Sequence, residues 1–271
     1  MGILKINYHM HSQYSIDGEM SIEEACEKAI ELGLKEIAFT DHLDIDWPDP
    51  NYEFGALDIE KYLIDIEKNR ERYKDCLKIK TGIEVGLQPH VLEEVEDIIV
   101  TYPFDFVIAS IHIIQRMDPY QGDYYKNRTK EECYRLYYEE TLELVKEFSN
   151  FDVLGHIGYI RRYSPFPYEQ DEDLICLSLI DEILKVLITK GKGIEVNTSG
   201  YKHASKTPMP TPRILARYKD LGGTIITLGS DAHTIDDVGF GLDLGCSVIR
   251  ESGFKHITSY TERKPEFISI I

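Results

Sequence analysis

The sequence predicts an α/β fold in which parallel strands alternate with covering helices and close into a barrel. Short apolar runs, typical of strands buried on both faces, alternate with amphipathic helical stretches along the chain. The ends of successive runs lie about 30 to 45 residues apart, roughly one β–α–β unit each. Nearly every run ends in a polar residue. Because only a ring brings all strand ends to one centre, a barrel is favoured over an open doubly wound sheet.

Seven strands are expected from these apolar runs. The first run leads into His9 and His11, which share one face because side chains two positions apart in a strand point the same way. The sixth run ends at Asn197, and the seventh ends at Asp231 with His233 just beyond it. The expected strands cover residues 3–8, 36–42, 78–85, 106–112, 151–156, 193–197 and 224–231.

Apolar stripes at helical spacing predict a covering helix after each strand. Ser21 with Glu24, and Thr129 with Glu132, form the S/T-x-x-E capping boxes that typically begin a helix. The expected helices cover residues 22–32, 59–73, 89–100, 129–148, 172–189, 211–222 and 242–251. From Lys255 onward the sequence predicts no more than one short strand.

Length and composition indicate a single domain over residues 1–271, since α/β barrels commonly use about 250 residues. The 48 acidic and 30 basic residues give a formal charge of -18, which should repel nucleic acid. An anionic substrate would then need a local positive centre, such as metal ions or arginines. The five cysteines are scattered, without C-x-x-C spacing, and are typical of buried thiols in a reducing compartment. No leader or membrane-length apolar run is recognised, so we expect a cytoplasmic protein without membrane association.

Histidines and carboxylates gather at the expected strand ends. A lone histidine at a strand end is more often structural than a ligand, but six of the nine histidines fall at this one end of the fold. Packed imidazoles and carboxylates would lack hydrogen-bond partners without cations between them. The set exceeds the four to six positions of one ion, so several ions of Zn, Mn or Fe type are expected. The candidate metal ligands are His9, His11, Asp17, His42, Glu84, His112, His156, Asp231 and His233.

In their order, these motifs resemble the polymerase and histidinol phosphatase (PHP) family over almost the whole chain. The motifs that carry the resemblance are His9-x-His11, Thr40-Asp41-His42, Gly82-Ile83-Glu84, Ser110-Ile111-His112, Gly155-His156 and Ser230-Asp231-Ala232-His233. Within the family, residues 155–161 and 195–200 are most similar to the stand-alone histidinol-phosphatases of histidine biosynthesis.

The resemblance implies a distorted (β/α)7 barrel with three divalent metal ions. Asp17 stands where many relatives have His, and Lys202 stands where many have Arg, so a point charge replaces a bidentate fork there. Carried over by motif, the ligands are His9, His11, Glu84 and Asp231 for the first ion, Glu84, His112 and His156 for the second, and Asp17, His42 and His233 for the third.

The activity that the resemblance implies is hydrolysis of L-histidinol phosphate to L-histidinol and phosphate. Glu84 can bridge two ions with its two oxygens, and paired ions hold a hydroxide that can attack phosphorus in line. Glu84, Asp231 and Arg161 are therefore the predicted catalytic residues.

Three residues beyond the strand ends are the predicted substrate contacts. Arg161 follows the strand of His156 into the barrel mouth and is expected to stabilise the phosphoryl oxygens, with a surface ion pair as the alternative. Arg162 is expected at the surface. Lys202 and His203 lie just past the sixth strand, where they could contact the phosphate or protonate the leaving oxygen.

Other functions remain open at this point. A phosphotyrosine or general phosphoesterase could use the same barrel, and a non-catalytic or exonuclease-like metal-binding module is a further alternative. The expected partner is a small-molecule phosphate monoester. Asp44 and Asp46 are candidate contacts for the substrate amine, although a solvated loop is the favoured interpretation of both. Metal identity and oligomeric state stay undetermined.

Overall fold

Seven parallel strand positions form the centre of the protein in a computed structural model, which describes residues 6–51, 54–169 and 172–270. The strands follow the order β1-β2-β4-β5-β6-β7-β8, and the two-residue strand β3 continues β2 along β4. Their bounds are β1 Ile6–Asn7, β2 Glu36–Phe39, β3 His42–Leu43, β4 Lys78–Gly86, β5 Phe106–Ser110, β6 Val153–Leu154, β7 Gly193–Asn197 and β8 Ile226–Gly229.

Contacts between the first and last strands bring the two edges of this sheet together. The Tyr8 N–H donates to the Leu228 carbonyl at 2.9 Å, and Met10 forms a parallel bridge with Ala232. The predicted parallel barrel is therefore confirmed, and an open sheet is ruled out. All strand ends that carry the polar motifs meet at one mouth.

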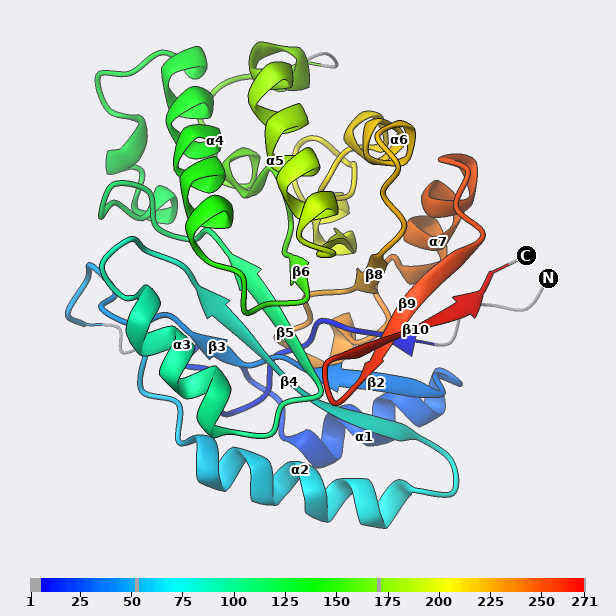
Figure 1. Ribbon diagram of the computed structural model, residues 1–271. Helices are drawn as coiled ribbons and strands as arrows, with labels where there is room; N and C mark the ends of the chain where they lie inside the picture. The colour runs from blue at the N-terminus through cyan, green and yellow to red at the C-terminus, as the bar shows by residue number, and fades with distance from the viewer. Residues whose placement is uncertain (1–5, 52–53, 170–171, 271) are drawn as a thin grey trace.

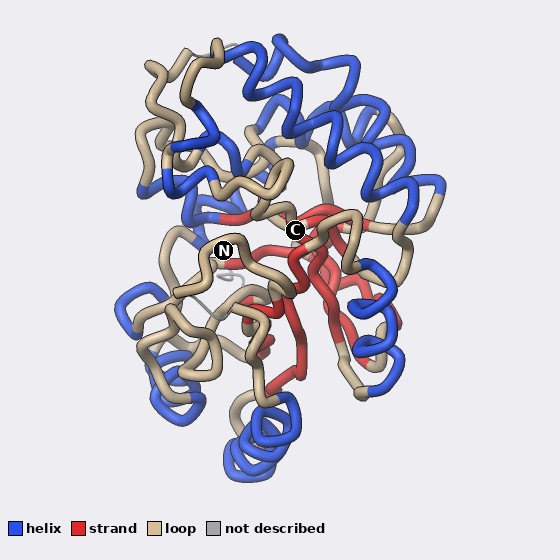
Figure 2. The backbone as a smooth tube through the Cα atoms, turned by 90° about the vertical axis from the view of Figure 1, so that its left-hand side faces the viewer, coloured by secondary structure: helices blue, strands red, loops and turns tan. Residues whose placement is uncertain are grey.

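The α-helices cover the outside of the barrel, as expected for parallel strands buried on both faces. Figure 1 shows α1, α2 and α3 on one half of the barrel and α4, α5, α6 and α7 on the other, and Figure 2 shows the strands enclosed between them. The helices are α1 Ile22–Glu31, α2 Ile59–Tyr73, α3 Leu92–Thr101, α4 Lys130–Glu147, α5 Leu177–Thr189, α6 Pro212–Asp220 and α7 Leu242–Glu251. Both predicted capping boxes are present, at Ser21 and at Thr129.

Short 3-10 helices connect strand ends to helices at the mouth of the barrel. They are η1 Pro119–Gln121, η2 Asp123–Tyr125, η3 Tyr159–Arg161, η4 Glu172–Cys176, η5 Thr198–Lys202 and η6 Ile235–Asp237. The helix expected over residues 172–189 is thus divided into η4 and α5, and the helix expected from residue 89 begins only at Leu92. No helix of the described residues is both long and apolar enough to cross a membrane.

The C-terminal tail forms a two-stranded antiparallel hairpin, where the sequence predicted at most one strand. Its strands are β9 His256–Thr261 and β10 Lys264–Ser269. The turn residues Glu262 and Arg263 both have positive φ, 50° and 63°, a turn that normally uses Asn or Gly. The sequence carries neither residue there, so it gives no local signal for this hairpin.

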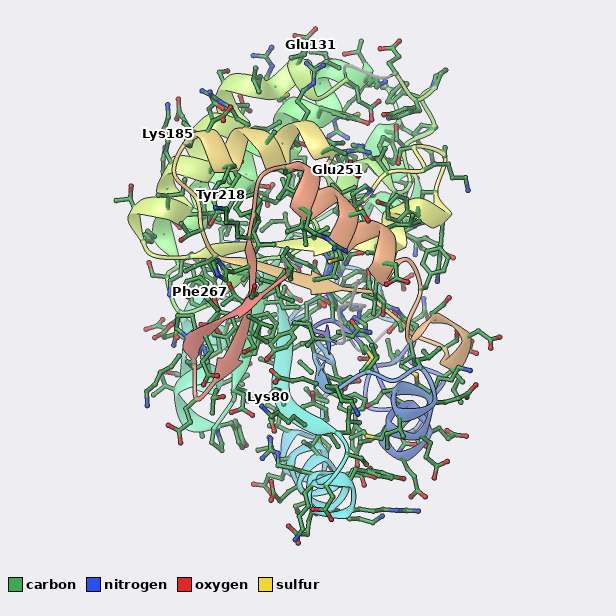
Figure 3. All side chains as sticks on the ribbon, turned by 90° about the vertical axis from the view of Figure 1, so that its right-hand side faces the viewer. Lys80, Glu131, Lys185, Tyr218, Glu251 and Phe267 are labelled. Carbon is green, nitrogen blue, oxygen red and sulfur yellow. The ribbon has the colours of Figure 1, made fainter. Side chains whose placement is uncertain are left out.

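The inner strand of this hairpin packs on the barrel, and the outer strand faces solvent. Tyr260 of β9 lies 5.0 Å, ring centre to ring centre, from Phe106 of β5, and its N–H donates to the Tyr8 hydroxyl at 2.9 Å. Phe267 on β10 is exposed (Figure 3). The tail is therefore a separate two-stranded sheet that packs against the barrel through β9.

Candidate metal centre

All nine predicted ligands come together at the mouth of the barrel. His9 and His11 follow β1, His42 begins β3, Glu84 lies in β4, and Asp231 follows β8. Each of these five residues is buried or nearly so. The other four ligands are Asp17 in the loop before α1, His112 after β5, His156 after β6 and His233 after β8.

The first predicted ligand set forms a compact group around one carboxylate oxygen. The Nε2 atoms of His9 and His11 lie 3.0 Å apart, and Glu84 Oε2 lies 3.2 Å from the former and 3.5 Å from the latter. Asp231 Oδ1 completes the group at 3.6 Å from His9 Nε2 and 3.3 Å from His11 Nε2. Four ligand atoms thus point toward one shared position.

The second predicted set surrounds the other oxygen of Glu84. Glu84 Oε1 lies 2.9 Å from His156 Nε2 and 3.4 Å from His112 Nε2, and those two nitrogens are 3.4 Å apart. Ser110 also donates its hydroxyl hydrogen to Glu84 Oε1 at 2.6 Å. The two oxygens of Glu84 therefore face two different ligand groups, as a bridging carboxylate requires.

The third predicted set is more open to solvent. Asp17 Oδ2 lies 3.3 Å from His233 Nε2 and 3.8 Å from His42 Nε2. The rings of His42 and His233 both stack on His11, with centroids 4.2 and 4.1 Å apart from it. His11 therefore connects the first group with the third.

The donor atoms fit divalent metal ions in both spacing and chemistry. Ligand atoms about 2.0–2.1 Å from a tetrahedral zinc lie about 3.3 Å from one another, which matches the separations in the first two groups. Burial alone would raise the pKa of Glu84, but His9, His112 and His42 hold it well below its usual value. Burial likewise favours neutral His9, yet Glu195, Glu84 and Asp231 raise its pKa well above normal. The carboxylates of the cluster are thus stabilised by positive charge close to them, which bound cations would also supply.

Two buried carboxylates orient the imidazoles from the side away from the ligand atoms, a role that the sequence did not predict for either. Glu195 of β7 lies 2.6 Å from His9 Nδ1 and accepts the His156 N–H at 2.8 Å. Asp44 lies 2.7 Å from His112 Nδ1 and 3.2 Å from His42 Nδ1. Such partners fix the tautomer and orientation of metal-binding histidines. A glutamate inside the apolar run of β7 was the available signal for Glu195.

The sequence favoured a solvated loop for Asp44 and Asp46, and the structure contradicts this for Asp44 and agrees with it for Asp46. Asp44 is buried, and its carboxylate contacts the imidazoles of His42 and His112. Asp46 is exposed and pairs with Arg116 and His90, so it lies outside the centre.

The backbone at the end of β8 is specialised for this packing. Asp231 has a φ of 56°, a left-handed conformation that is uncommon outside glycine, and its N–H donates to the His9 carbonyl at 2.9 Å. A Cβ atom on Gly229 would collide with His9 and with the carboxylate of Glu195. The last strand therefore needs a glycine to let the first strand place its histidine.

The two neighbouring arginines are placed in the opposite way to the sequence expectation. Arg161 is buried away from the cavity, where its Nε lies 3.0 Å from Glu172 and its Nη2 donates to the Thr207 hydroxyl at 2.7 Å. Arg162 lines the cavity, and its Nη2 lies 2.5 Å from Asp231 and 2.7 Å from Ser199 Oγ. The turn of η3 points consecutive side chains in different directions, which residue order alone could not reveal.

Lys202 and His203 both line the cavity, as expected from their place after β7. The Lys202 ammonium lies 2.5 Å from Asp237 and stacks over the ring of Phe240, 4.8 Å from its centroid. Burial and the nearby charge of Arg162 lower the pKa of His203 to about 4. This favours the neutral imidazole over a protonated general acid.

The ligand groups open into one cavity of about 450 Å³, a size that suits a small molecule. Trp47 and Phe54 form one wall, with ring centroids 4.4 Å apart, and Tyr159 packs 5.2 Å from His112. The rest of the lining includes Asp118, Tyr120, Gln121, Tyr163, Arg162 and Lys202.

Known proteins are similar to this chain in sequence and in fold. The family model described as PHP domain matches residues 7–199. A histidinol-phosphatase from Lactococcus lactis is 33% identical over 261 residues, which is 96% of each chain, and a probable histidinol-phosphatase from Clostridium acetobutylicum is 33% identical over 85% of this chain and 87% of its own.

Solved structures give the same result. The crystal structure of the Lactococcus lactis histidinol phosphate phosphatase in complex with zinc, L-histidinol and phosphate has a TM-score of 0.89, with 32% identity over 98% of this chain and 100% of that one. A Listeria monocytogenes structure described as a putative histidinol phosphatase has a TM-score of 0.74 at 20% identity, covers 89% of this chain and 99% of its own, and supports the fold alone.

Proposed function

This chain belongs to the PHP domain family, and we propose that it is a metal-dependent histidinol-phosphatase, which hydrolyses L-histidinol phosphate to L-histidinol and inorganic phosphate. The expected place of this reaction is histidine biosynthesis. The observation that carries the proposal is the single rim on which all nine candidate ligands meet, in a chain that matches a relative solved with zinc, L-histidinol and phosphate over 98% of its length.

The proposed centre takes three divalent ions in the three ligand groups. When bound, such ions act as Lewis acids and lower the pKa of coordinated water, which is the chemistry a phosphate monoester needs. Zinc fits the mixed imidazole and carboxylate donors, and Mn or Fe would also fit them. We further propose that residues 1–271 act as one domain, because the C-terminal hairpin packs against the barrel.

The chain's own residues hold and neutralise the phosphoryl group. Arg162 is held at the cavity wall by Asp231 and Ser199, so its guanidinium is ordered before substrate binds. Lys202 adds a second positive charge from the same side. Fixed cations beside a transferring phosphoryl group stabilise the charge that its oxygens carry in the transition state. Glu195 and Asp44 keep the imidazoles aligned throughout.

The test is phosphate release from L-histidinol phosphate by the purified protein loaded with zinc or manganese. We expect turnover of this ester well above that of a phosphotyrosyl peptide. Glu84→Gln should lower turnover by about 100-fold or more, since it removes charge from a carboxylate shared by two ligand groups. Exposed Glu266→Gln serves as the matched control and should behave as the unchanged protein.

Two outcomes would contradict the proposal. Preference for the phosphotyrosyl peptide would indicate a protein phosphatase on the same barrel. Full activity of Glu84→Gln, with unchanged metal content, would contradict the proposal that this carboxylate bridges two ions.

A further inference from the structure

One carboxylate on the cavity wall, that of Asp118, lacks a positively charged partner among the described residues. From this we infer that Asp118 binds the ammonium group of the substrate and makes the enzyme selective for phosphate esters of amino alcohols. The inference rests on the proposed function, because it assumes that the phosphoryl group lies at the metal centre. Asp118 would then contact the part of the substrate that lies beyond the phosphoryl group.

Every other carboxylate that lines the cavity already has a basic neighbour. Asp17 and Glu84 face imidazoles, Asp44 lies against His112, Asp231 against Arg162, and Asp237 against Lys202. Over the described ranges, no Lys, Arg or His nitrogen lies within ion-pair distance of Asp118. Buried charges in proteins are normally paired, so an unpaired carboxylate on a cavity wall points to a cationic ligand.

The immediate surroundings of Asp118 leave one of its oxygens available. The residue is only 6% exposed, and its Oδ1 accepts the Tyr120 N–H at 2.8 Å, capping the short helix η1. No hydrogen bond to its Oδ2 is found within the described part of the chain. Burial raises the pKa of this carboxyl; the Tyr120 N–H and the charge of His112 lower it in part, and the negative charges of Asp44 and Asp49 raise it. An ammonium ion would relieve the cost of this buried charge.

The cavity also carries charges of both signs on separate segments. Arg162 and Lys202 are tied to acidic residues that follow β8, whereas Asp118 follows β5 and has His112 and Asp44 as its charged neighbours. All three residues line the same cavity. A phosphate ester with an amine on the carbon next to its ester-bearing CH2 group carries a negative and a positive group that these residues could bind. L-histidinol phosphate is such a molecule.

The test compares two substrates on two proteins. Asp118→Asn removes the charge but keeps an oxygen that can cap η1, so the loop should retain its shape. We expect kcat/KM for L-histidinol phosphate to fall by on the order of 10- to 100-fold, mainly through KM, as for loss of a charged hydrogen bond. The rate on the deaminated analogue, 3-(imidazol-4-yl)propyl phosphate, should change less than twofold. Asp123→Asn, an exposed carboxylate of the same loop, is the matched control.

Equal losses on both substrates, or no loss on either, would overturn the role of Asp118. Binding of L-histidinol and of its deaminated alcohol to the metal-loaded protein, measured by calorimetry, provides a readout that does not depend on turnover. If the unchanged protein releases no phosphate, the proposed function fails, while calorimetry still decides whether Asp118 recognises the amine. If Asp118→Asn does not fold, Asp118→Ser, which also caps η1, replaces it in both assays.

Discussion

Arg162 and Arg161 are adjacent in the chain, but their guanidinium groups lie in different environments. Arg162 faces the cavity beside Asp231, and Arg161 faces Glu172 in the protein interior. The first environment orders a cation for substrate, and the second compensates a buried charge. The two residues should therefore respond to truncation in different ways.

We expect Arg162→Ala to lower kcat/KM for L-histidinol phosphate by about 10²–10³, as for other preorganised charge stabilisers. Arg161→Ala should lower kcat/KM less and should instead reduce the free energy of unfolding by about 1–3 kcal/mol, because buried Glu172 loses the guanidinium 3.0 Å away and keeps the Lys130 ammonium as its charged partner. Steady-state kinetics and urea unfolding of both variants measure the two effects. A larger loss of kcat/KM for Arg161→Ala than for Arg162→Ala would contradict this assignment and support Arg161 as the phosphoryl contact.

At this scale, the sequence predicts the residues at the strand ends better than those behind or beyond them. His9, His11 and Glu84 could be placed because a strand has a fixed alternation and its end has a known position. Asp44 and Glu195 act through the histidines, and their contacts with His112, His156 and His9 join segments 39 to 186 positions apart in the chain. No local pattern encodes such distances.

Among the secondary-structure elements, the strand–helix alternation was predictable and the C-terminal hairpin was not. Capping boxes and apolar stripes mark α1 and α4 in the sequence, and both helices begin where these signals lie. The hairpin turn uses Glu262 and Arg263 in a conformation that neither residue favours. Tertiary contacts hold this turn: Arg263 lies 2.6 Å from Asp152, and its N–H donates to the Asp105 carbonyl.

The Tyr8 hydroxyl joins the first barrel strand to this hairpin. It accepts the Tyr260 N–H at 2.9 Å and donates to the carboxylate of Glu36, and Tyr8 itself is fully buried. Tyr8→Phe would leave both partners without this hydrogen bond, so we expect the free energy of unfolding to fall by about 1–3 kcal/mol. Tyr73→Phe removes an exposed hydroxyl that contacts Glu27 and should stay within about 0.5 kcal/mol of the unchanged protein.

Denaturant unfolding of both tyrosine variants gives this comparison, with circular dichroism to establish that each is folded. Equal stability of the two would mean that the Tyr8 hydroxyl does not stabilise the hairpin. In that case the ring contact of Phe106 with Tyr260 and the polar contacts of Arg263 would hold the hairpin on the barrel.

On the scale of the whole molecule, the candidate metal centre connects strands from both ends of the chain. The first ligand group combines residues that follow β1 and β8, which close the barrel, with Glu84 of β4. Bound cations would therefore stabilise the closed ring as well as the reaction. The net charge of -18 adds to this effect, because the ions offset part of the repulsion among carboxylates.

We expect dialysis against a chelator to lower the stability of the protein, and zinc or manganese to restore it. A ligand that binds only the folded state adds about 4 kcal/mol when its free concentration is 1,000 times its dissociation constant. Urea unfolding of the stripped and reloaded protein, with metal content measured on each sample, gives the difference. Magnesium should restore less, because it prefers all-oxygen coordination. An unchanged urea midpoint after verified removal of metal would show that the ring closes without cations. Both oxygens of Glu84 face ligand groups, so added zinc should raise the free energy of unfolding of Glu84→Gln by less than it raises that of the unchanged protein.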